Sequence, residues 1–137
     1  ICRKVANLPA EGGAIEVWGD GLQTRSFLYI DECIEATRRL MDSDFIGPVN
    51  IGSEEMVTIN QLVETAAKVA GKNVEKIHID GPLGVRGRNS NNDLIREKLG
   101  WDYKQTLEEG IAKTYLWIEV QILKTQCNMC EAEEQGL

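Results

Sequence analysis

The chain has 137 residues, enough for one ordinary domain but short for a two-domain enzyme. Its formal net charge of -7 argues against broad nucleic-acid binding, which needs a basic face that releases counterions from phosphates. No apolar run reaches the roughly 18 residues of a membrane span, and no signal peptide opens the chain, so we expect a cytoplasmic protein with neither membranes nor nucleic acids as partners.

The first element predicted is the end of a helix, from Cys2 to Asn7, which Pro9 terminates. Lys4 lies on its last turn, where a cation is mildly favourable and a solvated lysine is ordinary. The sequence starts Ile-Cys-Arg-Lys without a methionine, so we expect a piece of a longer polypeptide.

The next stretch predicts a β-hairpin. Alternating apolar residues end at Trp18, Asp20-Gly21 supplies a tight turn, and an extended apolar run resumes from Phe27 to Ile30. The mouth of this hairpin would present three side chains together: Gln23, Thr24 and Arg25. A guanidinium beside an amide and a hydroxyl suits a phosphate, although an exposed arginine after an Asp-Gly turn is also ordinary hairpin chemistry.

The middle of the chain reads as scaffold. Asp31 is expected to cap a helix to about Met41, with its apolar spacing (Ile34, Thr37, Leu40, Met41) facing the core. A short strand is expected over residues 49–51, and the Asn50-x-Gly52 that closes it fits either close approach to a ligand or a plain turn. A capping box at Thr58 starts a helix to Ala70, and a strand follows over residues 74–79.

The second informative stretch runs from Gly81 to Ser90, where Arg86 and Arg88 flank a glycine in a polar loop. A helix is expected to start just after it, near residue 91 or 92, and to end at residue 99. Anion binding at this loop and helix start is physically favoured, and a solvated basic loop is an equal alternative.

The last helix is expected to begin with a capping box at Thr106, and its apolar face runs to Ile122. From residue 125 to 137 the sequence is polar and acidic and is expected to be a disordered tail. Its Cys127-x-x-Cys130 pair lacks the second pair of ligands of a structural zinc site, so no metal site is expected.

Several motifs carry a family resemblance. Gly-Asp-Gly-x-Gln-x-Arg-x-Phe-x-Tyr-Ile-Asp at residues 19–31, Val-Asn-Ile-Gly-Ser-Glu-Glu-Met-Val at 49–57 and Gly-Val-Arg-Gly-Arg-Asn-Ser at 84–90 resemble extended short-chain dehydrogenase/reductase enzymes that act on nucleotide sugars. The resemblance implies an α/β fold: residues 1–124 would be the C-terminal, sugar-nucleotide-binding part of such an enzyme, with its Rossmann half missing.

By this resemblance, the substrate contacts are Lys4, Gln23, Thr24, Arg25 and Arg88. Arg25 and Arg88 would clamp the diphosphate of a GDP-sugar, with Arg86 as a supporting charge. Binding remote from the reacting sugar contributes to catalysis because it holds the sugar against cofactor and acid/base groups.

The complete enzymes of this group would be NAD-dependent epimerases, but this sequence has no Gly-x-Gly-x-x-Gly and no Tyr-x-x-x-Lys. We therefore predict no catalytic residue, no cofactor-binding residue and no turnover by the chain alone. Apolar faces made for the missing half would otherwise be exposed, so we expect that half or self-association to cover them. The alternatives are another nucleotide-sugar epimerase or dehydratase, or a stand-alone nucleotide-sugar-binding module.

Overall fold

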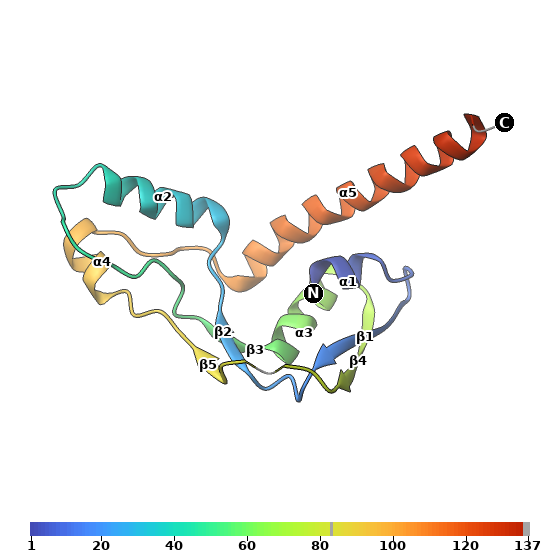
Figure 1. Ribbon diagram of the computed structural model, residues 1–137, viewed down its shortest axis with the longest axis horizontal. Helices are drawn as coiled ribbons and strands as arrows, with labels where there is room; N and C mark the ends of the chain where they lie inside the picture. The colour runs from blue at the N-terminus through green and yellow to red at the C-terminus, as the bar shows by residue number, and fades with distance from the viewer. Residues whose placement is uncertain (83, 136–137) are drawn as a thin grey trace.

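The computed structural model describes the backbone of residues 1–82 and 84–135, and the side chains of the same residues as far as 125. Helices and strands are mixed along the chain, and the strands form two small sheets (Figure 1). The elements are α1 (Cys2–Ala6), β1 (Gly12–Trp18), β2 (Thr24–Ser26), α2 (Ile30–Met41), β3 (Met56–Thr58), α3 (Ile59–Ala70), β4 (Asn73–Ile79), β5 (Gly87–Arg88), α4 (Asp93–Leu99) and α5 (Leu107–Gln135).

The first sheet pairs β1 with β4 in parallel, from Gly12 opposite Asn73 to Trp18 opposite Ile79. Gly12 is required because a Cβ there would lie 1.8 Å from the carbonyl oxygen of Asn73, and its φ of 112° also disfavours other residues. Three helices supply the apolar partners of this sheet: α1, α3 and the first turns of α5. The first core is formed by Cys2, Val5, Ile15, Val17, Val63, Ala66 and Tyr115.

The second sheet has the order β3-β2-β5, with β2 antiparallel to β3 and parallel to β5. The hairpin predicted from β1 to β2 is therefore wrong, because each of these strands pairs elsewhere. The second strand was expected over the apolar run from Phe27 to Ile30. It lies earlier in the chain and ends at Ser26, and the apolar run leads into α2 instead.

A second core lies beside α2 and α4, on the left of the three-stranded sheet in the view of Figure 1. Ala36, Ile95 and Trp101 are its buried members, and Ile95 is fully enclosed. It shares no buried residue with the first core. The chain therefore has two small apolar centres, with the three-stranded sheet between them (Figure 1).

The helices with clear capping signals are confirmed. Thr58 and Gln61 exchange the two bonds of a capping box at the start of α3, and Gly71 ends this helix in the left-handed conformation. Thr106 and Glu109 form the corresponding bonds at the start of α5. The predicted strand at residues 74–79 is also confirmed as β4.

Two other predictions are wrong. Residues 49–51 form no strand, and they run as irregular chain toward β3, which the sequence analysis missed. The apolar side of α2 does not face the core: Ile34 is 51% and Met41 78% exposed, while the small Ala36 is buried. The buried residues of α2 are Glu32 and Ala36, and Ala36 is the one that belongs to the second core.

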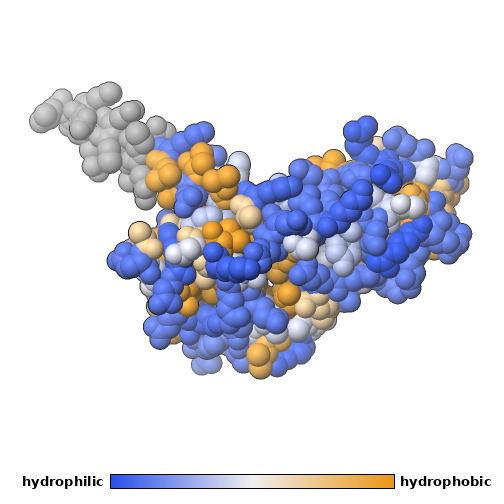
Figure 2. Space-filling view, turned by 180° about the vertical axis from the view of Figure 1, so that it is seen from behind, coloured by the Kyte–Doolittle hydropathy of each residue, from blue (hydrophilic) through white to orange (hydrophobic). Residues whose placement is uncertain are grey.

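The last helix, α5, continues to Gln135, so the backbone is helical through most of the segment for which a disordered tail is predicted. The side chains of Cys127 and Cys130 lie outside the described residues, and the disorder of this segment stays a prediction. The described part of α5 exposes apolar side chains, including Leu116, Trp117 and Leu123 (Figure 2). No helix among the described residues is long and apolar enough to cross a membrane.

We predict that Ile95→Ala lowers the free energy of unfolding by about 3 kcal/mol, because it leaves a cavity in a core with few members. Leu94→Ala is the matched control, since Leu94 is on the same helix but 38% exposed, and it should cost well under half as much. Urea unfolding followed by circular dichroism measures both changes. Equal losses for the two variants would contradict the assignment of Ile95 to this core.

Candidate anion-binding site

A pocket of about 320 Å³ lies at one edge of the three-stranded sheet. Its lining comes from β2, the residues before β3 and the segment around β5. The lining residues are Arg25, Ser26, Leu28, Asn50, Ile51, Gly52, Ser53, Arg88, Asn89 and Ser90. We call it the basic pocket, because this lining includes two arginines and no carboxylate although the whole chain has a net charge of -7.

The two arginines meet because of strand register. In the parallel pair β2–β5, Arg25 is directly opposite Arg88, and residues opposite each other in a sheet project from the same face. Each would be repelled by the other unless an anion lies between or beside them. The sheet thus places two guanidinium groups where a phosphate or diphosphate could bind both.

Backbone carbonyls hold the guanidinium of Arg25 in place. Its Nη1 donates to the carbonyl of Thr24 and its Nη2 to the carbonyl of Val85, both at 2.6 Å. Both acceptors are neutral, so the positive charge of Arg25 is not balanced by them. Arg88 is exposed at the other side of the pocket and is the more accessible of the two.

Arg86, expected as a supporting charge, has a different role. Its Nη1 lies 2.9 Å from a carboxylate oxygen of Asp20, and this ion pair joins the loop after β1 to the segment before β5. The backbone N–H of Leu22 and the Arg86 guanidinium together hold the pKa of Asp20 below its ordinary value. Because Asp20 balances its charge, Arg86 adds little positive charge to the basic pocket, which it does not line.

The other predicted contacts lie outside the basic pocket. Lys4 is on α1, where its Nζ donates to the carbonyl of Glu16 at 2.8 Å. Gln23 is buried beneath the end of β1 and its Nε2 donates to the carbonyl of Trp18, while its Oε1 has no partner among the described residues. Thr24 lies in β2 with its hydroxyl beside Gly87. The structure brings together Arg25 and Arg88 only.

At the N-terminus of α4, where anion binding is expected, two backbone N–H groups already have acceptors within the protein. The N–H of Asn92 donates to Glu54 at 3.0 Å, and that of Asp93 donates to the side chain of Asn91 at 2.9 Å. Both donors are satisfied within the protein. The lining of the basic pocket at this end comes from Arg88, Asn89 and Ser90 of the preceding loop and includes no residue of α4.

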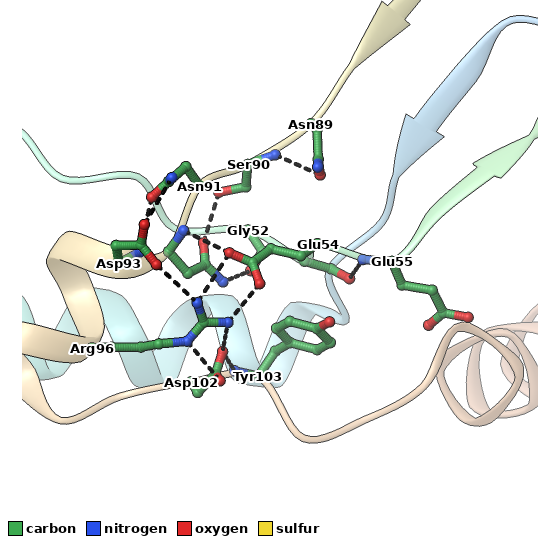
Figure 3. Close-up of polar contacts among 12 residues, drawn as sticks. Gly52, Glu54, Glu55, Asn89, Ser90, Asn91, Asp93, Arg96, Asp102 and Tyr103 are labelled. Atoms are coloured by element: carbon green, nitrogen blue, oxygen red, sulfur yellow. Dashed lines mark hydrogen bonds and ion pairs between the residues drawn. The ribbon is translucent and has the colours of Figure 1, made fainter.

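Below the pocket, Arg96 forms close ion pairs with the carboxylates of Glu54 and Asp102 and a longer one, at 3.5 Å, with that of Asp93 (Figure 3). Its guanidinium lies 2.6 Å from Glu54 and 2.8 Å from Asp102. Hydrogen bonds from Arg96 hold the pKa of each carboxyl below its ordinary value, and the two carboxylates raise the pKa of Arg96. This network joins α4 to the segment before β3, through Glu54, and to the segment after α4, through Asp102.

The pairing of Arg96 with Glu54 and Asp102 and the burial of Asn92 were not predicted from the sequence. Glu54 and Arg96 are 42 positions apart, and no local pattern indicates that they meet. The Asn50-x-Gly52 segment, left open between a ligand contact and a plain turn, does line the basic pocket. The polar residues that follow Arg88 were visible as part of the same loop.

A larger pocket of about 400 Å³ lies between α1 and α5, but its chemistry is different. Trp117, Ile118 and Ile122 line it, and Arg3 is its one charged residue among those described. Binding sites combine shape with a few converging polar groups. The basic pocket has these groups, so we treat it as the candidate site.

The family profile described as GDP-mannose 4,6 dehydratase matches residues 1–114. The chain belongs to this family. The curated relatives below are named as epimerases and a decarboxylase of nucleotide sugars.

Among curated relatives, the chain is 57% identical to a GDP-mannose 3,5-epimerase of Arabidopsis thaliana over 99% of its own length, which is 35% of that protein. It is 55% identical to GDP-mannose 3,5-epimerase 1 of Oryza sativa subsp. indica over 90% of its length, and 37% identical to UDP-glucuronic acid decarboxylase 6 of Arabidopsis thaliana over 80%. The chain thus spans about one third of the length of these relatives.

Solved structures of nucleotide-sugar epimerases share the fold. The UDP-glucose 4-epimerase of Thermotoga maritima, solved with UDP-glucose, superimposes with a TM-score of 0.79 at 26% identity, over 88% of this chain and 38% of that one. The UDP-glucuronic acid 4-epimerase of Bacillus cereus, solved with UDP-glucuronic acid and NAD, gives 0.73 at 27% identity, over 79% and 36%. The predicted fold, part of an extended short-chain reductase, is confirmed.

One of these structures was solved with NAD, and a site for this dinucleotide would need particular elements in the present chain. That site needs a glycine-rich turn from a strand directly into a helix. In the described residues, the glycines after β1 lead to β2, and β3 enters α3 through Thr58 without a glycine. These elements do not fit the cofactor.

We predict that the Arg96 network makes stability depend on acidity. Because the folded-state pKa values of Glu54 and Asp102 are lowered, their contribution is present at neutral pH and is lost as the pH falls below about 4. Arg96→Met should therefore lower the melting temperature at pH 7 and flatten its decline between about pH 5 and 3.

Lys98→Met is the control for this prediction, because Lys98 is on the same helix but pairs with the neighbouring, exposed Glu97. Its acid dependence should match that of the unmodified chain. Thermal melts across the pH series compare the three proteins. A decline as steep in Arg96→Met as in the unmodified chain would show that the network has no such role.

Proposed function

We propose that this chain binds the GDP-sugar substrate as part of an NAD-dependent epimerase that interconverts GDP-D-mannose and GDP-L-galactose. The observation that carries the proposal is the pairing of Arg25 with Arg88 in a polar pocket without carboxylates. The high identity to two GDP-mannose 3,5-epimerases supports the choice of nucleotide and sugar.

The diphosphate of a GDP-sugar offers oxygens on two phosphates, which suit a pair of guanidinium groups. Two guanidinium groups on one face can each donate to oxygens of a different phosphate, and charge-assisted hydrogen bonds are stronger than neutral ones. The neighbouring Asn89 adds a neutral amide donor that can orient a ligand. Arg25 is already held by two carbonyls, so little side-chain freedom is lost when an anion binds.

In this proposal the chain contributes binding and orientation, and it does not complete a turnover alone. The elements for NAD do not fit, and a tyrosine followed at the right spacing by a lysine does not occur in the sequence. The remaining contacts predicted for Lys4, Gln23 and Thr24 would then be made in the complete enzyme, in the company of its Rossmann half. A cytoplasmic location stays a prediction.

Other nucleotides are the main alternative, because several structural relatives were solved with UDP-sugars. A stand-alone binding module is a second alternative with the same pocket. Titration with GDP-mannose, GDP, UDP-glucose and dTDP-glucose distinguishes the proposed GDP-sugar from the other nucleotides, because the preferred nucleotide should bind most tightly. An upstream coding sequence with the glycine-rich loop would favour part of a longer enzyme over the stand-alone binding module.

We predict that Arg25→Ala and Arg88→Ala each weaken GDP-mannose binding at least tenfold, because each removes one charged contact to the diphosphate. Arg→Lys at either position should recover only part of the loss, since an ammonium group cannot donate two parallel bonds. Calorimetric titration measures the affinities, and circular dichroism verifies that each variant is folded.

Arg39→Ala is the matched control, because Arg39 pairs with Glu35 on α2 and does not line the basic pocket. Its affinity should equal that of the unmodified chain. Unchanged affinity in Arg25→Ala or Arg88→Ala would remove that arginine from the site. If the folded, unmodified chain binds none of the nucleotides, the proposal fails for the chain alone.

We also propose that the exposed apolar side of α2, formed by Ile30, Ile34 and Met41, is covered by the Rossmann half in the complete enzyme and by a second copy in its absence. The expected result is a mass above that of a monomer in light scattering at high concentration. Ile34→Gln should lower this mass, whereas Glu75→Gln on β4 should not. A monomer at all concentrations would contradict self-association.

A further inference from the structure

Two loops that are distant in sequence touch at the base of the basic pocket. One contains Gly52 and the other contains Ser90, and both residues line the pocket (Figure 3). A Cβ placed on Gly52 would lie 2.6 Å from the Cβ of Ser90 and 2.7 Å from its hydroxyl oxygen. The two loops are therefore in direct contact, and a larger residue at Gly52 would push them apart.

Asn92 closes this contact. It is fully buried, its Nδ2 donates to the carbonyl of Gly52 at 2.8 Å, and its Oδ1 accepts from the Ser90 hydroxyl at 2.7 Å. Its backbone N–H donates to Glu54, which also pairs with Arg96. One side chain thus bonds to both loops, and an ion pair restrains it from below. We call Gly52, Ser90 and Asn92 the loop clip.

We propose that the loop clip sets the width of the basic pocket and positions Arg88 opposite Arg25 for a diphosphate ligand. The inference rests on the proposed function for the identity of the ligand. Arg88 is two positions from Ser90, so a shift of this loop moves Arg88 relative to the strand that carries Arg25. Gly52, Ser90 and Asn92 are positioning residues, because they act through the arginines.

The geometry supplies a variant that is specific for this spacing. Gly52 has no left-handed φ, so alanine is allowed by its backbone, and the clash with Ser90 is the reason that alanine does not fit. Ser90→Gly removes both atoms that the new methyl group would meet. The double variant Gly52→Ala/Ser90→Gly should thus relieve the clash, and Ser90→Gly alone measures the cost of losing the hydroxyl that donates to Asn92.

The experiment is a double-mutant cycle on the full chain, with GDP-mannose and inorganic pyrophosphate as titrants. We expect Gly52→Ala to weaken binding about tenfold in the unmodified chain and less than about twofold when Ser90 is already glycine. Gly110→Ala is the control, because its methyl group would meet Tyr29 at an ordinary 3.5 Å and Gly110 does not line the basic pocket. An equal loss in both backgrounds would overturn the proposal.

Hydrogen exchange of the ligand-free proteins tests the clip without any ligand. Gly52→Ala and Asn92→Ala should speed exchange in both segments 50–55 and 88–93, while α3 stays as protected as before. Faster exchange in one segment alone would overturn the clip. If Gly52→Ala does not fold, Asn92→Ala and the double variant provide the same comparison.

The two proposals can fail separately. If the unmodified chain binds no nucleotide sugar and no pyrophosphate, the proposed function fails, and the positioning role falls with it even when exchange shows that the clip joins the loops. If the unmodified chain binds and the cycle shows no coupling between Gly52 and Ser90, the positioning role alone is overturned.

Discussion

The parallel pairing of β2 with β5 is the contact on which the candidate site depends. It is only two residue pairs long, yet it brings Arg25 beside Arg88 and closes one side of the basic pocket. A pairing this short has little stability of its own. Its support comes from β3 on the other side of β2, from the Arg86–Asp20 ion pair and from the hold of Arg25 on the Val85 carbonyl.

An acidic protein can bind an anion when its few cations are not balanced locally. Most charged side chains of this chain that form ion pairs do so at the surface, where such pairs contribute little. Arg25 differs because its partners are neutral carbonyls. The electrostatic character of the site is therefore decided by which arginines lack a carboxylate, and the net charge does not predict it.

The sequence predicted the features that depend on neighbouring residues. The capping boxes at Thr58 and Thr106 and the ends of α3 and α4 could be predicted because each requires residues within one turn of helix. The strands β2 and β3 are too short for an alternating pattern, so their pairing could not be predicted. For α2, the spacing located an apolar side but could not reveal that the described chain leaves it uncovered. The arginines of the site were candidates for anion binding from their polar loops, and a family resemblance assigned them to a diphosphate, whereas their adjacency required the structure.

The walls of the basic pocket come from three stretches of chain that are remote in sequence, around Arg25, Gly52 and Arg88. Local elements such as α3 can form within microseconds, but contacts between remote segments must first close long loops and form later. A refolding chain would therefore acquire most of its helical structure before it acquires the pocket. During synthesis the same order holds, because the strand that carries Arg25 has no partner in β5 until residues 87–88 have left the ribosome.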